Sequence, residues 1–335
     1  MPFAINAPLA PDRFVGRKKA IDYVSGRLAE YSRQSTCLAG GPLTGKTSLL
    51  RYLAQANASA DLPGLKDSCR VLFDGFSVGV SMLPSGFWAG ILRGLQANPK
   101  TAPALQPLLT DKLTKAKADQ IDVYDLEDVF DAFVSAKMPV IIFINNFEVL
   151  LQSSHFWPPN DFFHQVRSLG QRDVSFVITT YRKLLDLWDP NKGASPFYNV
   201  FTNFSVGLLE EDEIRQFLKS GFNDLELPLE PDVEEVIIEG SEGHPYLVNY
   251  LAQLCTDCLK AGKVIEVKML EDAFQDPSGP VVSLIHQIRG CLSPSEKALL
   301  DTLGTNPSKL TENQKNYLRD LRTYGLLPPG LKSIL

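Results

Sequence analysis

The sequence lacks a long apolar run, a signal-like leader and a regular set of cysteines, and each shortage excludes a class of protein. Without 18 consecutive apolar residues, no segment is expected to span a membrane. The start, MPFAINAPLAPDRF, has neither the basic leader nor the apolar core of a secretory signal. The five cysteines are an odd number at irregular spacing, which favours a reducing compartment over a disulfide framework. We therefore expect a cytoplasmic protein.

Two of the cysteines, Cys255 and Cys258, form a lone CxxC. No second pair and no histidine stands nearby, and the surrounding run YLVNYLAQLCTDCLKAG has apolar residues at helical spacing. The pattern favours cysteines in a helix core, with a zinc or redox site as the alternative.

An excess of positive charge is also missing. Lys and Arg number 33 against 39 Asp and Glu, a net charge of −6, whereas a surface that grips nucleic acid needs clustered cations. The content of 44% hydrophobic and 21% charged residues is typical of globular proteins. A chain of 335 residues is long enough for two or three domains, each with its own core.

Short apolar runs alternate with segments of helical periodicity in the first two thirds of the chain. This alternation predicts an α/β fold with a doubly wound, mainly parallel sheet of five strands. The segment 98–121, which has several prolines and then the charged run TDKLTKAKAD, is expected to form a short helix and a surface loop. The expected strands lie within 35–40, 69–78, 139–146, 174–181 and 200–209, and a helix is expected over 17–32.

From Glu210 onward the sequence reads as successive helices without a convincing strand. We predict three domains: an α/β nucleotide-binding domain over 1–209, a helical lid over 210–278, and a winged-helix-like domain over 279–335. In the last, Ser293 is the expected cap of one helix, and a turn is expected at Gly325.

The strongest motif is the unbroken GxxxxGK[ST] that lies between an expected strand and an expected helix. Its glycines let backbone N–H groups turn toward phosphate oxygens at a helix N-terminus. Lys46 is expected to reach the β and γ phosphates, and Thr47 to place its hydroxyl on Mg²⁺. The alternative is a glycine-rich turn with a coincidental lysine. The motif and the next residue are Gly40, Gly41, Pro42, Leu43, Thr44, Gly45, Lys46, Thr47 and Ser48.

A P-loop enzyme also needs acids at the end of a neighbouring strand, and here that position reads Asn145-Asn146. The Asn145 carbonyl oxygen can bind a metal-bound water, but neither side chain can act as a general base. Glu148 is the candidate substitute, although the pattern favours the alternative that it is a carboxylate stabilised at a helix start. We expect nucleotide binding with weak or absent hydrolysis.

Polar residues also follow the fourth expected strand, VSFVITTY. Thr180 and Arg182 are the candidate γ-phosphate sensors, because the carboxyl ends of parallel strands face the ligand. The alternative for Arg182 is an ordinary surface cation at the start of a loop.

Four segments together resemble the STAND-type ATPases of bacteria and archaea, relatives of AAA+ and replication-initiator ATPases. They are Phe14-Val15-Gly16-Arg17, the P-loop, Asn145-Asn146-Phe147-Glu148 and Gly243-His244-Pro245-Tyr246. The resemblance implies ATP or ADP with Mg²⁺, base contacts from Val15, Gly16 and Pro245 with Arg17 beside them, and a lid contact from His244. The double asparagine departs from the family pattern.

The resemblance favours a regulatory switch in which ATP stabilises one conformation, with protein partners or self-oligomerisation, in bacterial defence or signalling. Because family members carry an effector or sensor domain and the chain ends at Leu335 without one, we expect a piece of a longer protein or one component of a system. The alternative is an AAA+ ATPase of DNA transactions that binds DNA through the winged helix. The expected recognition helix, 312–324, mixes acids with its cations, which disfavours DNA. A small-substrate phosphotransferase ranks last.

Overall fold

The computed structural model describes residues 3, 5, 7–29, 33–55, 62, 64–79, 81–157, 161–172, 174–189, 191, 196–276 and 278–331. The chain forms two compact units. The sheet unit consists of residues 19–39 and 49–204, and the helical unit of residues 1–18, 40–48 and 205–335. The predicted domain boundaries after residues 209 and 278 stay predictions.

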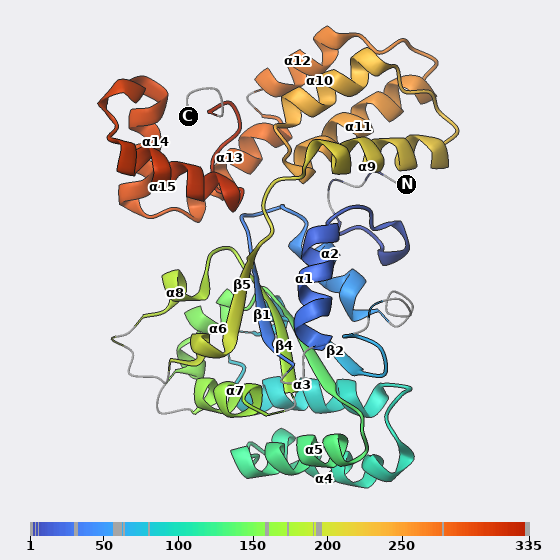
Figure 1. Ribbon diagram of the computed structural model, residues 1–335, viewed down its shortest axis with the longest axis vertical. Coiled ribbons are helices and arrows are strands. Elements are labelled where there is room, and N and C mark those ends of the chain that lie inside the picture. The colour runs from blue at the N-terminus through green and yellow to red at the C-terminus, as the bar shows by residue number, and fades with distance from the viewer. Residues whose placement is uncertain are drawn as a thin grey trace. The chain divides into compact units, whose positions relative to one another are not determined.

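The sheet has the order β2-β3-β4-β1-β5, and the β2–β3, β3–β4 and β1–β4 pairs are parallel (Figure 1). Crossover helices follow from this arrangement, because parallel strands cannot be joined by tight turns. The predicted five-stranded, mainly parallel sheet is confirmed. The strands are β1 (Ser35–Ala39), β2 (Cys69–Asp74), β3 (Val140–Asn145), β4 (Val174–Thr180) and β5 (Phe201–Ser205).

The neighbouring strands β3 and β4 lie inside the sheet and are buried along their whole length. Their near-continuous Val, Ile and Phe residues suit strands that are covered on both faces. The register pairs Asp74, the last residue of β2, with Asn145, the last residue of β3. Polar residues thus meet where the apolar strands end.

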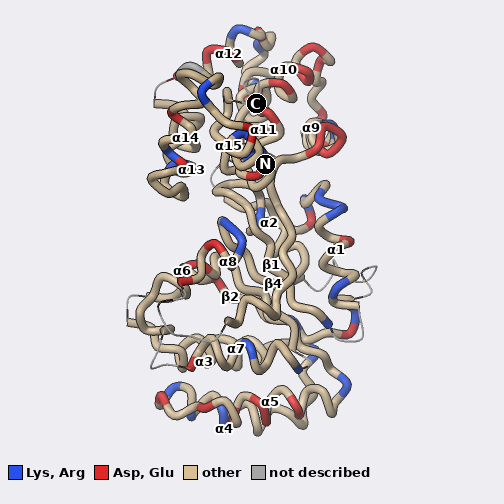
Figure 2. Tube along the Cα trace, turned by 60° about the vertical axis from the view of Figure 1, so that its left-hand side comes forward, with Lys and Arg blue, Asp and Glu red and all other residues tan. Residues whose placement is uncertain are grey.

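Helices surround this sheet, and α4 and α5 lie beyond α3 on the side away from the strands (Figures 1 and 2). The predicted helix over 17–32 is present as α1, although residues 30–32 lie outside the described residues. The helices are α1 (Lys18–Ala29), α2 (Lys46–Ala54), α3 (Pro84–Ala97), α4 (Gln106–Lys117), α5 (Val123–Ser135), α6 (Glu148–Gln152), α7 (Phe162–Gly170) and α8 (Leu184–Leu187).

The prediction of a short helix and a surface loop in the segment 98–121 was wrong, because the charged run lies almost entirely within α4, a helix of 12 residues. Leu109, Leu113 and Ala116 form a buried stripe at helical spacing. The buried Lys112 ammonium binds Asp125 Oδ1 of α5 at 2.6 Å. The charged residues that suggested a loop therefore include Lys112, which forms an ion pair between α4 and α5.

The helical unit contains α9–α15, as predicted from the change of pattern at Glu210. Acidic residues gather along α9 (Figure 2), where carboxylates of the first turn favour the positive end of the helix. The helices are α9 (Glu211–Asp224), α10 (Pro231–Ser241), α11 (Pro245–Lys260), α12 (Val267–Gln275), α13 (Pro280–Gly290), α14 (Pro294–Thr305) and α15 (Glu312–Thr323).

The last three helices end in the turn expected at Gly325, whose φ is +66°. Ser293 caps α14 as predicted, since its hydroxyl accepts from the Glu296 N–H at 3.3 Å. No strand follows α15 among the described residues up to Leu331, so the wing of a winged helix stays a prediction.

Short 3₁₀ helices connect these elements, and the described helices include none that combines the length and apolar character needed to cross a membrane. The 3₁₀ helices are η1 (Pro11–Arg13), η3 (Gly75–Ser77), η4 (Pro103–Leu105), η5 (Ser154–Phe156), η7 (Phe197–Val200) and η8 (Pro307–Lys309).

Candidate functional site

The glycine-rich motif forms the predicted strand–loop–helix unit, since β1 ends at Ala39 and α2 begins at Lys46. A Cβ on Gly40 would lie 2.0 Å from the Val206 carbonyl oxygen, so this position requires glycine. Gly45, with φ of +87°, turns the chain into the helix. The loop thus ends at a helix N-terminus, where backbone dipoles attract an anion.

Lys46 is buried, with 8% of its surface exposed, and its ammonium donates to the Gly41 carbonyl at 2.6 Å. The Thr44 hydroxyl donates to the same oxygen at 3.0 Å. After Thr47, the Ser48 hydroxyl accepts a hydrogen bond from the Leu9 N–H at 3.0 Å. These hydrogen bonds fix the conformation of the loop and hold the Lys46 ammonium against the Gly41 carbonyl.

Arg17 fixes the loop to the segment that leads into α9. Its guanidinium donates to the carbonyls of Thr44 at 2.8 Å, Gly207 at 2.7 Å and Leu208 at 3.0 Å. Its backbone N–H donates to Glu213 Oε1 at 2.5 Å. Burial lowers the pKa of Arg17 to about 10 although Glu213 raises it, so the side chain stays charged at neutral pH.

His244 and Pro245 form the start of α11, as the sequence predicted. The His244 Nδ1 accepts from the Tyr246 N–H at 3.3 Å, so the proton of the neutral ring lies on Nε2. This Nε2 is buried and has no hydrogen-bond partner among the described residues. Burial, together with the positive charges of Arg17 and Lys46, lowers the pKa of His244 to about 3. A neutral imidazole therefore stands beside the loop.

The turn after α15 also contacts the loop, which the sequence did not reveal. The Gly41 N–H donates to the Tyr324 carbonyl at 2.5 Å. A Cβ on Gly41 would lie 2.4 Å from the Gly325 carbonyl oxygen, and a Cβ on Gly325 would lie 2.6 Å from Thr44 Cγ2. Two glycines thus allow two backbones to approach closely. The feature of the sequence that could have indicated this contact was Gly325, the glycine that follows the last helix.

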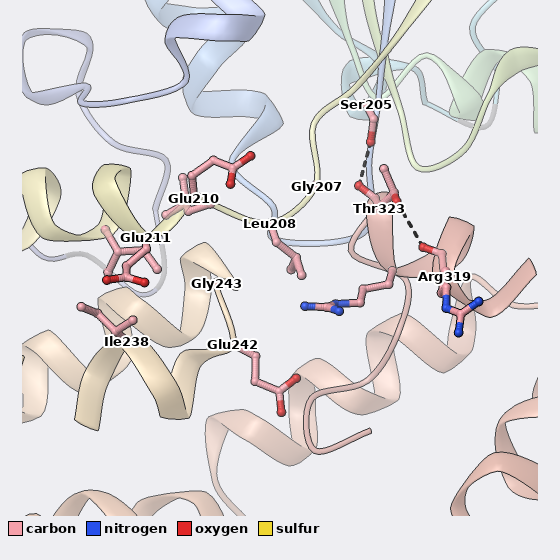
Figure 3. A pocket seen from close by; sticks show the side chains of 13 residues that line it. Ser205, Gly207, Leu208, Glu210, Glu211, Ile238, Glu242, Gly243, Arg319 and Thr323 are labelled. Atoms are coloured by element: carbon pink, nitrogen blue, oxygen red, sulfur yellow. Dashed lines mark hydrogen bonds between the residues drawn. The ribbon is translucent and has the colours of Figure 1, made fainter. Parts of the chain in front are cut away.

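A cavity of about 640 Å³ lies within the helical unit next to this turn (Figure 3). Its lining combines the segment before α9, the end of α10 and the last turn of α15. Carboxylates and guanidinium groups both contribute to it, so its charge is mixed. Its lining includes Leu208, Glu210, Glu242, Gly243, Arg319 and Arg322.

The sheet unit contains a polar cluster at the carboxyl ends of β2, β3 and β4, which includes the predicted residues Asn145 and Asn146. The Thr179 hydroxyl donates to Asn145 Oδ1 at 3.0 Å and accepts from the Asn146 N–H at 2.9 Å. Asp74, which sequence reasoning missed, accepts from Asn146 Nδ2 at 3.1 Å and from Asn145 Nδ2 at 3.4 Å. The apolar run CRVLFD, which ends in an acid, was the signal for it.

The other residues predicted in this unit lie around the cluster. Glu148 is the first residue of α6 and is half-buried. The Thr180 hydroxyl is buried and donates to the Arg182 carbonyl. Because that hydroxyl is engaged by its own turn, Thr179 rather than Thr180 is the β4 residue that joins the asparagines. The sensor roles of Thr180 and Arg182 stay predictions.

Among the described residues, no group of three or more His, Cys, Asp or Glu side chains is placed to hold a metal ion. Cys255 is buried in α11, and burial raises its thiol pKa to about 12. Cys258 donates to the Val264 carbonyl at 3.3 Å. Cys255 therefore lies in a helix core, as the sequence predicted, whereas Cys258 is only half-buried.

No family model and no curated protein matches the chain. Among solved structures, a Walker-type ATPase of Pyrococcus abyssi is similar, with 15% identity over 97% of this chain and 93% of that chain and a TM-score of 0.59. The ORC2 protein of Aeropyrum pernix, in ADPNP–ADP complexes, has 15% identity over 99% and 85% and a TM-score of 0.55. The Thermotoga maritima RuvB branch migration motor, at 14% identity over 95% and 87%, has a TM-score of only 0.45 and carries no argument. The first two likenesses confirm the P-loop ATPase fold.

Proposed function

We propose that the chain is an ATP-binding regulatory switch of the STAND type, with slow turnover, whose nucleotide state controls its conformation and through it partner binding or self-assembly. The observation that carries the proposal is the hydrogen bond from the Gly41 N–H to the Tyr324 carbonyl. Through this bond, a change in the conformation of the phosphate loop changes how the turn after α15 packs against it.

A ligand changes a conformational equilibrium only when it binds the two states with different affinity. Phosphates in the loop and the turn at Tyr324–Gly325 both contact the backbone of residues 40–47, so binding one changes the free energy of binding the other. This coupling is reciprocal: docking of the turn changes nucleotide affinity by the same factor.

The residues present fit an anionic nucleotide with Mg²⁺. The buried Lys46 and the N-terminus of α2 suit the phosphates, and the Thr47 hydroxyl suits Mg²⁺, which prefers hard oxygen ligands. In the sheet unit, Asn145 Oδ1 accepts from Thr179, so Asn145 is a weaker candidate for the metal shell. When bound, Mg²⁺ neutralises charge on the phosphates. The ADPNP and ADP in the Aeropyrum pernix structure support an adenine nucleotide.

The alternative, an ATPase of DNA transactions, finds less support in α15. Lys315 forms an ion pair with Glu312 at 3.1 Å, and Arg319 donates to Asn316 at 2.7 Å. Cations engaged on their own helix are poorly placed to replace the counterions of DNA phosphates.

The first test is the nucleotide content of the purified chain, released and identified, together with ATP affinity by calorimetry. We expect bound ATP or ADP, lost in Lys46→Ala. A chain that carries no nucleotide and binds no ATP would overturn the proposal.

The second test addresses the coupling. In Gly325→Ala the added Cβ would meet Thr44 and the backbone would be strained at its positive φ, so the turn should undock. We expect ATP affinity to change at least fivefold and amide hydrogen exchange over 312–327 to rise. Gly290→Ala is the control, because no atom lies within 4 Å of the added Cβ. Unchanged affinity and exchange in Gly325→Ala would contradict the coupling.

A further inference from the structure

The cavity within the helical unit is lined by two opposite charges that do not pair with each other. Arg322 lies in the last turn of α15, and Glu242 follows the last residue of α10. No ion pair joins them, and no acceptor among the described residues binds the Arg322 guanidinium. Glu242 Oε1 accepts from the Gly330 N–H at 2.9 Å, which leaves Oε2 without a donor in the described chain. One cation and one anion are thus available to a ligand.

The other charged residues of the lining already have partners. Glu211 forms an ion pair with Arg215 at 2.7 Å, and Arg319 donates to Asn316 Oδ1 at 2.7 Å. Glu210 belongs to the capping box at the start of α9. The two unpaired groups therefore decide which charges a ligand of this cavity must have.

Apolar side chains line the cavity beside these charges. They include Leu208, Leu209 and Ile238, and Figure 3 shows Leu208 and Glu242 on opposite sides of the cavity. Its volume of about 640 Å³ lies in the range of small-molecule sites, about 300–1,000 Å³. The phosphate loop, residues 40–48, contributes nothing to the lining. The cavity thus suits a small molecule that binds apart from the loop.

The unpaired charges select the class of small molecule. A carboxylate matches a guanidinium, because two parallel N–H groups can bind its two oxygens. An ammonium has three donors and no acceptor, so it suits the open Oε2 of Glu242. A ligand with only one of these charges leaves one group of the cavity unpaired and is repelled by the group of its own sign. The cavity therefore favours a zwitterion with an apolar side chain.

We infer that this cavity binds a free amino acid or a short peptide with apolar side chains, and that this ligand is an effector of the switch. The carboxylate of the ligand binds Arg322, its ammonium binds Glu242, and its side chain packs against Leu208 and Ile238. The effector role rests on the proposed function, whereas the binding site itself does not.

The segment before α9 connects the cavity to the phosphate loop within the helical unit. Gly207 and Leu208 line the cavity, and their carbonyls accept from the Arg17 guanidinium at 2.7 Å and 3.0 Å. The same guanidinium donates to the Thr44 carbonyl of the loop at 2.8 Å. A ligand that holds this segment against α15 therefore acts on the loop, and the coupling between the two ligands is reciprocal.

The first experiment compares four probes on the wild-type full chain by calorimetry. L-Leucine and the dipeptide leucyl-leucine have both charges, leucinamide lacks the carboxylate, and 4-methylpentanoate lacks the ammonium. At millimolar concentration we expect at least one zwitterion to bind, at least about tenfold more tightly than either single-charge analogue. Tighter binding of leucine indicates an amino acid as the ligand, and tighter binding of the dipeptide a peptide. Absence of zwitterion binding, or equal affinity for the analogues, overturns the inference.

Two variants test whether the probe binds in the cavity. Arg322→Met keeps an apolar stem without the charge, and Glu242→Gln keeps an acceptor for the Gly330 N–H. Each should weaken zwitterion binding at least about tenfold, with the fold checked by circular dichroism. The matched controls Arg93→Met, exposed on α3, and Glu239→Gln, exposed on α10, should bind as wild type does. Wild-type affinity in a folded Arg322→Met would place the probe elsewhere and overturn the inference.

The effector role is tested by calorimetry of Mg-ATP with and without saturating zwitterion. We expect ATP affinity to change at least about fivefold, and zwitterion affinity to change by the same factor when ATP is bound. Zwitterion binding with unchanged ATP affinity overturns the effector role. A chain that binds the zwitterion but no ATP overturns the proposed function and leaves the binding site intact. A chain that binds ATP but no zwitterion overturns this inference alone.

Discussion

The surroundings of the phosphate loop and the strand-end cluster differ in how their polar groups are balanced. Around the loop, the cations Arg17 and Lys46 donate to backbone carbonyls, and the neighbouring imidazole of His244 is neutral. At the strand ends, two neutral amides surround one carboxylate, Asp74. Beside the loop, the Glu213 carboxylate accepts from the Arg17 N–H next to these two cations, whereas the carboxylate of the cluster, Asp74, has amide partners.

This difference distinguishes the residues suited to bind phosphates from those suited to activate water. Positive charge and helix dipoles suffice to hold phosphates. Activation of water needs a base, and the cluster contains one carboxylate, Asp74. Substitutions in the first region should therefore act on stability and affinity, and those in the second on turnover and charge repulsion.

The largest effect is expected from Arg17→Met, which removes the guanidinium that donates to the carbonyls of Thr44, Gly207 and Leu208. We expect the free energy of unfolding to fall by about 4 kcal/mol, since each unsatisfied group costs about 1–3 kcal/mol. Urea denaturation followed by circular dichroism measures it. Arg13→Met, at an exposed arginine of η1, is the control. An equal loss in both variants would show that the carbonyl contacts are unimportant.

Lys46→Ala should weaken ATP binding by about 2–3 kcal/mol, the range of a charge-assisted hydrogen bond, or roughly 30–150-fold. Calorimetry with Mg-ATP measures the change, and Lys117→Ala, at an exposed residue of α4, should leave affinity unaltered. ATP affinity in Lys46→Ala equal to wild type would remove the loop from the binding site.

His244 should make stability depend on pH. Its pKa is about 3 in the folded chain and about 6.5 in the unfolded chain, so the unfolded state gains a proton first as pH falls. The contribution of the neutral His244 to the free energy of unfolding is therefore fully present above pH 6.5 and is lost as pH falls from 6.5 to 3. From pH 7.5 to 5 the free energy of unfolding should fall by about 2 kcal/mol.

Urea denaturation of His244→Asn at both pH values tests this, because asparagine can still accept from the Tyr246 N–H. We expect the variant to lack that part of the decline, and His286→Asn, at an exposed residue of α13, to retain it. Equal pH dependence in wild type and His244→Asn would mean that the folded chain protonates this imidazole freely.

The smallest effect is expected from Asn145→Asp, which places a second carboxylate beside Asp74. Repulsion should raise the pKa of the pair and lower stability by about 1 kcal/mol at pH 8, with the loss disappearing as pH falls and one carboxyl is protonated. Denaturation at pH 8 and pH 4 measures it, with the exposed Asn199→Asp as control. A variant as stable as wild type at pH 8 would show that the two side chains do not face each other.

Much of the fold could be predicted because its signals are local. Apolar runs predicted the five strands, the GxxxxGK[ST] motif predicted the loop between β1 and α2, and Ser293 predicted the start of α14. The prediction failed for α4, where Lys112 forms an ion pair with a helix that begins later in the chain. Charge alone could not distinguish that pair from a solvated loop.

Sequence reasoning could predict the candidate site only where its residues lie close together in one segment of the chain. Asp74 and Asn145 are 71 positions apart, and Gly41 and Tyr324 are farther apart still, so their contacts depend on strand order and on packing between helices. Thr179 rather than Thr180 joins the asparagines because the Thr179 hydroxyl donates to Asn145 of the neighbouring strand, whereas the Thr180 hydroxyl donates to the Arg182 carbonyl. Such pairings are properties of the folded chain.

The guanidinium of Arg17 has a consequence for the order of folding. It joins Thr44 to Gly207, and Gly207 lies 190 positions from Arg17 in the sequence. Contacts of such separation close large loops and tend to form after local structure. Interactions absent from the folding transition state mainly slow unfolding. We therefore expect Arg17 to slow the unfolding of the chain and to leave its rate of folding nearly unchanged, which extends the lifetime of the folded state.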